Sequence, residues 1–152
     1  MATIGVFASI FDSTGCILLV RHAYGTRAWS TPGGRIEAGE SLVVALEREV
    51  REEIASETRI AHLIGVYAKP YREDVVLSFA VNVISGVPRP CLPEISDVGY
   101  FSRDSLPTQL AFNSRVRIED AFDRLRGVVR VFDTAESLEA SLDAYARGHA
   151  KA

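Results

Sequence analysis

The sequence predicts a single α/β (α+β) domain in which a mixed β-sheet packs against helices. Three observations support this fold class: β-branched apolar runs typical of strands, stretches with helical periodicity, and an irregular order of the two. The 152 residues, of which 47% are hydrophobic and 24% charged, suffice for one well-packed core and are few for two.

The first part of the chain is predicted to form a hairpin, a loop and a helix. Apolar runs at 4–11 and 16–22 flank the turn sequence Asp-Ser-Thr-Gly, which favours a β-hairpin. Residues 23–34 contain three glycines and a proline and are predicted to form a loop. A helical period then runs from Ser41, a suitable N-cap, to about Ile54.

The second part alternates strands and helices irregularly, without an internal repeat. The expected elements are strands over 59–68 and 75–84, a Pro-rich loop over 85–96, a short strand over 97–102, a helix over 113–126, a strand over 128–132 and a last helix from 133 to about 148. We therefore expect a main domain over residues 1–132 and a helical tail over 133–152, packed on the domain or on a dimer partner.

Composition and charge exclude several classes of protein. The formal net charge of −3 argues against a broad nucleic-acid-binding face, so no nucleic-acid polymer is expected as a partner. No apolar run is long enough to cross a bilayer, and the N-terminal stretch lacks the basic segment of a secretion signal. Cys16 and Cys91 are too few for a disulfide framework. A cytoplasmic protein without membrane contact is expected.

The helix predicted over 41–54 carries a carboxylate on its apolar side. At about 100° per residue, an apolar stripe is formed by Leu42, Val43, Leu46, Val50 and Ile54. Glu53 falls inside this stripe, Glu49 lies at its edge, and Glu52 lies one step further round. Arg48 and Glu52 are four residues apart and should form an ion pair, whereas Glu49 and Glu53 lack a partner.

Such a cluster of acids requires a physical reason, because like charges repel and a carboxylate facing a core is costly unless neutralised. A solvated charged face, with Arg48 and Arg51 offsetting part of the charge, is one interpretation. The other is a hard divalent cation, Mg²⁺ or Mn²⁺ as its substitute, since these ions prefer oxygen ligands. The preceding Pro32-Gly33-Gly34 favours the second, because it lets the backbone approach a ligand closely.

The same residues resemble the signature of the Nudix hydrolases. Five residues separate Gly34 from Glu40, and seven more precede Arg48-Glu49-Val50-Arg51-Glu52-Glu53. The resemblance implies the family's α/β/α sandwich, with a mixed β-sheet between helices. This chain departs from the family pattern at Ala55 and Ser56, where a glycine and an aliphatic residue are usual. Since that glycine ends the helix in a left-handed turn, we expect the helix to end differently or to continue.

The resemblance implies an enzyme that hydrolyses the pyrophosphate bond of a nucleoside diphosphate linked to another group, with Mg²⁺ as cofactor. The implied metal ligands are Glu49, Glu52, Glu53 and the carbonyl of Gly33. Arg48 and Glu40 are implied to orient these carboxylates and complete the catalytic set, and Gly34 lets the loop fold onto the helix. The proton of the attacking water would pass to Glu52, to Glu53 or to a residue outside the motif: Glu73, Glu119 or, as the best candidate, Glu94.

The sequence says less about the substrate. Within the family, a proline at the place of Pro70, fifteen residues past Ala55, accompanies ADP-ribose pyrophosphatases, which slightly favours ADP-ribose or a nucleotide sugar. The alternatives are a house-cleaning nucleoside triphosphate pyrophosphohydrolase and a non-catalytic nucleotide-sensing module, although such modules typically lose motif glutamates. The family also includes many dimers, so a homodimer is expected.

Candidate substrate contacts are aromatic residues for base stacking and arginines for phosphates. They are Trp29, Tyr24, Tyr67 and Phe112, and Arg21, Arg27 and Arg72, and Gly34 is a further predicted substrate contact. His22, His62 and His149 are too widely spaced to predict a zinc site, and no function is assigned to them.

Overall fold

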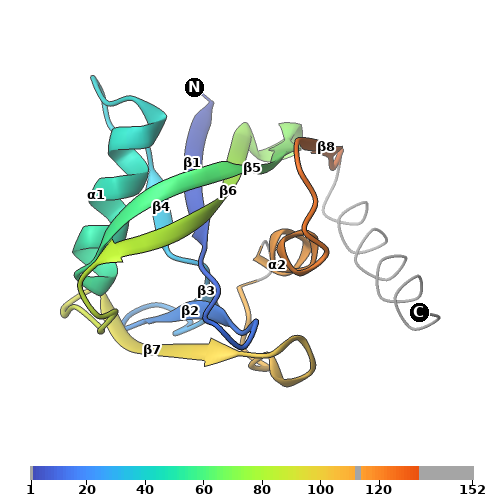
Figure 1. Cartoon of the computed structure of the whole chain (residues 1–152). Coiled ribbons are helices and arrows are strands. Elements are labelled where there is room, and N and C mark those ends of the chain that lie inside the picture. The colour runs from blue at the N-terminus through green and yellow to red at the C-terminus, as the bar shows by residue number, and fades with distance from the viewer. Residues whose placement is uncertain (1, 112–113, 134–152) are drawn as a thin grey trace.

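The computed structural model describes residues 2–111 and 114–133, which form two β-sheets, the larger with one helix on each face (Figure 1). The elements are β1 (Thr3–Ser9), β2 (Ile17–His22), β3 (Trp29–Ser30), β4 (Gly33–Arg35), α1 (Leu42–Ile54), β5 (Glu57–Lys69), η1 (Pro70–Arg72), β6 (Asp74–Ser85), β7 (Ile95–Phe101), η2 (Arg103–Ser105), α2 (Ser114–Phe122) and β8 (Val128–Val131).

The larger sheet is mixed, as predicted. Its strand order is β4-β1-β6-β5-β8, with parallel pairs β1–β6 and β5–β8 and antiparallel pairs elsewhere. The smaller antiparallel sheet has the order β3-β2-β7, and the sequence did not predict that it would be separate. Figure 1 shows α1 and α2 on opposite sides of the larger sheet, with the smaller sheet below. The α/β/α arrangement is confirmed.

The two predicted hairpins have different outcomes. The β5–β6 hairpin is confirmed, and its turn begins at Pro70. The β1–β2 hairpin is correct only at its turn, where Phe11 bridges Ile17 and the amide of Leu18 donates to the carbonyl of Ile10 at 2.8 Å. Beyond the turn the two strands separate into different sheets, because β1 pairs with β4 and β6 instead.

Helix α1 begins as predicted and ends in a way that was not predicted. The side chain of Ser41 accepts a hydrogen bond from the amide of Val44 at 3.2 Å and caps the first turn. At the other end Ala55 adopts a left-handed conformation with φ 55°, and its amide donates to the carbonyl of Arg51. The expectation of a different ending is therefore wrong: alanine takes the backbone conformation that glycine takes more easily.

The apolar stripe of α1 is also narrower than predicted. Leu46, Val50 and Ile54 are fully buried with Ala45, and they pack against Val6 and other residues of β1 and β2. Each large side chain buried in this way contributes about 1.5–3 kcal/mol. Leu42 and Val43, in the first turn of the helix, are instead exposed, at 38% and 42%.

Helix α2 covers the other face of the sheet and is shorter than predicted. It ends at Phe122, where Arg124 takes a left-handed conformation and the amide of Leu125 donates to the carbonyl of Asp120. Asp120 is fully buried and accepts hydrogen bonds of 2.8 Å from the hydroxyl of Tyr67 and from Arg130. These bonds join α2 to β5 and to the predicted strand β8.

The helical tail predicted over 133–152 lies outside the described residues, apart from its first residue. Among the described helices, none has the length and apolar character that crossing a membrane would require.

Candidate active site

The carboxylate of Glu53 reaches from α1 to the edge strand β4. Its Oε1 accepts a hydrogen bond of 2.7 Å from the amide of Gly33, and the residue is only 2% exposed. Gly33 pairs with Phe7 of β1, and a Cβ at position 33 would collide with the carbonyl oxygen of Val6. The prediction that Glu53 faces the core is confirmed, and a glycine is required where the strand passes so close.

Burial and neighbouring charge make this carboxylate hard to ionise. Burial, aided by the charges of Glu49, Glu94 and Glu52, raises the pKa of Glu53 to about 8. Burial, together with Glu52 and Glu94, also raises the pKa of Glu49, against the opposing effect of Arg48. The site therefore gathers negative charge that a bound cation would relieve.

Arg48 connects the acids of the motif. Its guanidinium donates to both oxygens of Glu40, at 2.6 and 2.9 Å, and to Oε1 of Glu49 at 3.0 Å. The predicted pair with Glu52 is confirmed at 3.4 Å. The hydrogen bond from Arg48 lowers the pKa of Glu40 to about 2. The expectation that Glu49 lacks a partner is wrong, because the long arginine side chain also reaches the adjacent residue.

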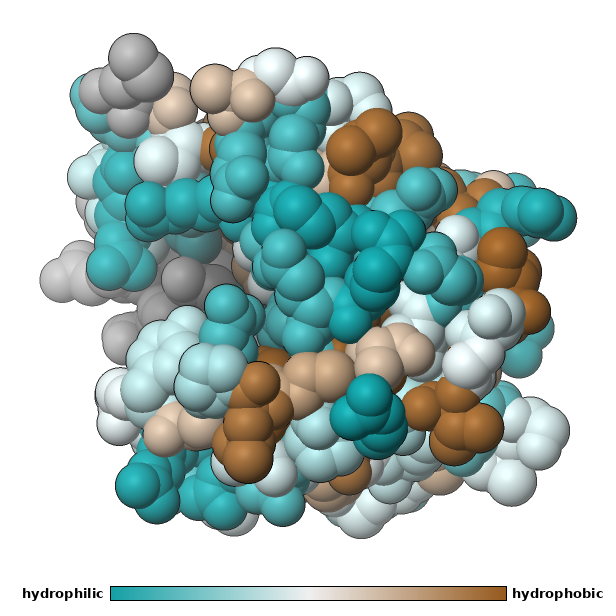
Figure 2. All heavy atoms as spheres, turned by 90° about the vertical axis from the view of Figure 1, so that its left-hand side faces the viewer, coloured by the Kyte–Doolittle hydropathy of each residue, from teal (hydrophilic) through white to brown (hydrophobic). Residues whose placement is uncertain are grey.

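Gly34 makes room for Glu49. A Cβ at position 34 would collide with the carboxylate of Glu49, so a side chain there would displace one of the predicted ligands. Figure 2 faces α1 and shows that hydrophilic side chains gather over the middle of this surface. Glu52, with a 49% exposed side chain, belongs to this outer surface, whereas Glu49 is 14% exposed.

The donor types fit a hard divalent cation. Three carboxylates project from one helix beside a glycine strand, and two of them have raised pKa values. Within residues 2–111 and 114–133, no three acidic, histidine or cysteine side chains form a ready-made metal cluster. Glu49 accepts a hydrogen bond from Arg48, and Glu53 accepts one from the amide of Gly33.

Of the three candidate acids outside the motif, Glu94 is the one whose charge acts on Glu49 and Glu53. Its loop attaches to the end of α1, where the amide of Cys91 donates to the carbonyl of Glu53 at 3.1 Å. Its charge contributes to the raised pKa values of Glu49 and Glu53. Glu119 is instead bound by Arg103 at 2.9 Å, and Glu73 follows η1 in the β5–β6 turn.

A cavity of about 520 Å³ opens beside Gly33 and Gly34. Of the predicted substrate residues, Gly34, Arg72 and Tyr24 line it. Its wall also contains residues for which no role was predicted: His22, Arg35, Lys69, Asp74 and Arg117. Arg35 directly follows the glycine pair and could have been anticipated; the others are brought in by strand register and by α2.

The remaining predicted contacts lie elsewhere. Trp29 packs edge-on against Phe101, with ring centroids 5.1 Å apart, in an apolar cluster. Tyr67 is 3% exposed and bound to Asp120. Arg27 is not among the residues lining the cavity, and its carbonyl accepts a hydrogen bond from Arg21. Phe112 lies outside the described residues.

The sequence also matches a known family. The profile of the NUDIX domain matches residues 1–121, which is more than half of the chain. The chain therefore belongs to the Nudix hydrolase family. A NUDIX hydrolase from Nitrosomonas europaea superposes with a TM-score of 0.76 and 22% identity, over 88% of this chain and 80% of that one. At this identity the likeness shows the fold alone.

Three curated relatives carry different names. NAD-capped RNA hydrolase NudC of Pseudomonas aeruginosa is 38% identical over 89 residues, which are 59% of this chain and 32% of that protein. The putative 8-oxo-dGTP diphosphatase of Bacillus subtilis is 30% identical over 120 residues, which are 79% and 80% of the two chains. The ADP-ribose pyrophosphatase of Methanocaldococcus jannaschii is 30% identical over 96 residues, 60% and 56% of the two. The chain thus spans about a third of the NudC protein.

Proposed function

We propose that the protein is a Mg²⁺-dependent pyrophosphohydrolase that cleaves the phosphoanhydride bond of a nucleoside diphosphate derivative. One observation carries the proposal. The carboxylates of Glu49 and Glu53 lie beside Gly33 and Gly34, where the cavity lined by arginine and lysine side chains opens. A pyrophosphate bound at this opening would contact the acidic metal ligands, with the basic side chains of the cavity beyond it.

Each residue has a role in this proposal. Glu49, Glu52 and Glu53, with the carbonyl of Gly33, hold the metal, while Arg48 and Glu40 orient the carboxylates. When bound, Mg²⁺ neutralises charge on the pyrophosphate and makes the attacking water more acidic. The hydrogen bond of 2.7 Å from Gly33 to Glu53 positions this carboxylate relative to the strand at the cavity opening.

The proton of the attacking water passes to Glu52 or Glu53, or to Glu94 on the loop attached to the end of α1. Replacement of Glu94 by Gln tests the last assignment, with Glu73→Gln as the matched control on the β5–β6 turn. A loss of kcat in the first variant alone supports Glu94 as the base. Wild-type kcat in both variants assigns the proton to Glu52 or Glu53 of the motif.

For the substrate, Pro70 and the relative named an ADP-ribose pyrophosphatase slightly favour ADP-ribose or a nucleotide sugar. A nucleoside triphosphate is the alternative, supported by the relative named a putative 8-oxo-dGTP diphosphatase, which matches more of both chains. A nucleotide sensor without activity is disfavoured because the motif glutamates are all present. A cytoplasmic homodimer is part of the same proposal, and light scattering of the purified chain tests the dimer.

A panel of nucleotides tests the proposal. The panel contains ADP-ribose, a nucleotide sugar, NADH and the nucleoside triphosphates, each incubated with Mg²⁺ and with EDTA. We expect Mg²⁺-dependent cleavage of at least one compound, lost in Glu53→Gln. Nucleotide binding without cleavage of any compound would instead support the sensor interpretation and contradict the proposal.

A further inference from the structure

The cavity beside the glycine pair has an excess of positive charge. Its cationic lining residues are Arg35, Lys69, Arg72 and Arg117, and Asp74 is its acidic one. Lys69 pairs with that carboxylate, with Nζ and Oδ2 2.9 Å apart, and Thr3 donates to the other oxygen at 3.0 Å. The single acid is therefore already engaged, and its charge is balanced by Lys69.

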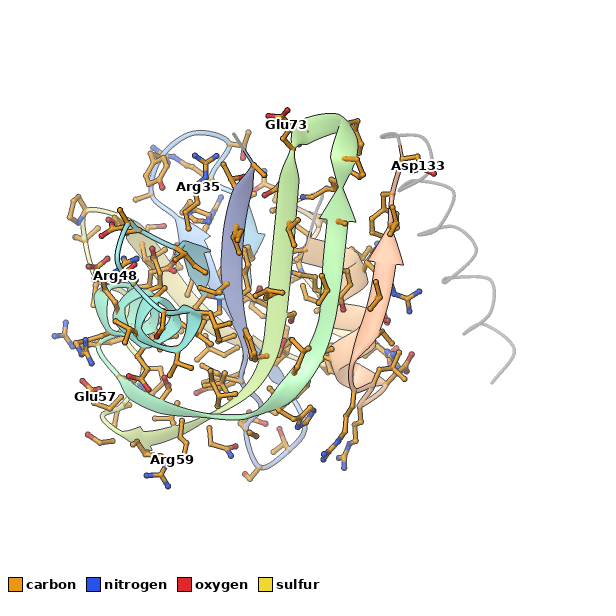
Figure 3. All side chains as sticks on the ribbon, turned by 90° about the horizontal axis from the view of Figure 1, so that it is seen from above. Arg35, Arg48, Glu57, Arg59, Glu73 and Asp133 are labelled. Carbon is orange, nitrogen blue, oxygen red and sulfur yellow. The ribbon has the colours of Figure 1, made fainter. Side chains whose placement is uncertain are left out.

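Strand register places the cavity residues of β1, β4, β5 and β6 along one end of the larger sheet and on one face of it. Thr3 of β1 pairs with Asp74 of β6, which pairs with Lys69 of β5, and Arg35 of β4 pairs with Gly5 of β1. Residues directly opposite one another, or two apart along a strand, share a face. In Figure 3, Arg35 and the β5–β6 turn with Glu73 lie toward the same side of the molecule, away from Arg59.

The remaining cations differ in burial. Arg117, 3% exposed, is fixed in the wall, with its guanidinium carbon 4.2 Å from the centroid of the Phe7 ring and a hydrogen bond to Ser114. Arg35 and Arg72 are exposed at the rim. Within the part of the chain that the structure describes, neither rim arginine forms an ion pair with a carboxylate. Both guanidinium groups can therefore bind an anionic ligand.

We propose that this cavity binds a phosphate group beyond the two phosphates of the bond that is cleaved, so that the enzyme prefers substrates with an additional phosphate. This inference rests on the proposed function, because it assigns the cleaved pyrophosphate to the glutamate side of the opening. The additional phosphate has two sources: the terminal phosphate of a nucleoside triphosphate, or a phosphate monoester on the ribose. A nucleoside triphosphate or a nucleotide with a phosphorylated ribose would then be preferred over ADP-ribose, which Pro70 slightly favours, because the neutral sugar of ADP-ribose would leave the rim arginines unused.

Calorimetric titration with matched, uncleavable ligands tests the inference. The first pair is α,β-methylene-ADP and α,β-methylene-ATP, and the second is AMP and adenosine 2′,5′-bisphosphate. The titrations are done in EDTA, so that metal binding by the added phosphate does not contribute. We expect the additional phosphate to tighten binding at least about tenfold in one of the pairs, which identifies its source.

Substitutions of the two rim arginines test whether the preference for the additional phosphate arises in the cavity. Arg35→Ala and Arg72→Ala should each reduce the tenfold ratio to about threefold or less, and both together should abolish it. Arg59→Ala, which removes the same charge from an exposed position at the other end of β5, should leave the ratio unchanged. Ratios below about tenfold in both pairs, or a ratio that survives the double replacement, would overturn the inference.

The phosphate site and the proposed hydrolase activity can be refuted independently of each other. Binding is measured without turnover, so it can be determined even if no compound in the nucleotide panel is cleaved. Conversely, cleavage of ADP-ribose together with equal binding within each pair would refute the phosphate site and leave the hydrolase assignment intact.

Discussion

Replacing Glu53 by Gln should stabilise the metal-free protein, and the gain should grow with pH. The amide resembles the protonated acid in shape and retains an oxygen that can accept the hydrogen bond from Gly33. The carboxyl is almost fully buried, and its pKa rises from 4.5 to about 8 on folding. An acid with a raised pKa binds more protons in the folded than in the unfolded state, so its ionisation opposes folding.

The magnitude follows from these two pKa values. Between pH 4.5 and about 8, the unfolded state is ionised while the folded state stays protonated, so the free energy of unfolding falls as pH rises. The loss from this group reaches about 1 kcal/mol near pH 5 and about 4 kcal/mol near pH 8, above which it levels off. Below pH 4.5 both states are protonated and the group contributes nothing.

Urea unfolding in EDTA at a series of pH values measures this difference between wild type and Glu53→Gln. Glu52→Gln is the matched control: it makes the same change one residue earlier, on a side chain that is 49% exposed, and should shift the free energy by less than about 1 kcal/mol. An advantage for Glu53→Gln that is equal near pH 5 and near pH 8, or that is absent, would refute the reasoning.

Three further substitutions test other parts of the structure. Ala55→Gly should raise stability by about 1 kcal/mol, because φ is 55° there; an unchanged melting temperature would contradict this. Asp120→Ala should lower the free energy of unfolding in urea by about 3–5 kcal/mol, because it leaves the hydroxyl of Tyr67 and the guanidinium of Arg130 without their buried acceptor. A loss below about 1 kcal/mol would show that the contact is dispensable. Gly34→Ala should lower kcat/KM at least about tenfold, since its Cβ displaces Glu49, and full activity would argue against the ligand arrangement.

The elements with strong local signals were predictable from sequence. The cap at Ser41, the helix to Ile54 and the β5–β6 hairpin each follow from periodicity and turn residues close to one another in the chain. The separation of β1 and β2 into two sheets was not predictable in this way, because strand partners far apart in sequence decide it. Ala55 shows the same limit: tertiary packing imposes a conformation that its side chain disfavours.

Part of the candidate site was likewise predictable from the sequence, and part was not. The glutamates and Arg48 lie within one helix, so their spacing revealed them before the structure did. Lys69 and Arg117 reach the cavity from β5 and α2, and no spacing in the sequence relates them. Trp29 and Tyr67 were plausible stacking residues by type, but their packing in apolar clusters is decided by neighbours distant in the chain.

Divalent-cation uptake by the acidic cluster tests the central claim most directly. Isothermal titration with Mn²⁺ should show binding by wild type that is lost when Glu49 and Glu53 are both replaced by Gln. The double variant should remain folded by circular dichroism, since these changes remove buried or half-buried charge. Identical Mn²⁺ binding by both proteins, or no binding by wild type with or without nucleotide, would contradict the account.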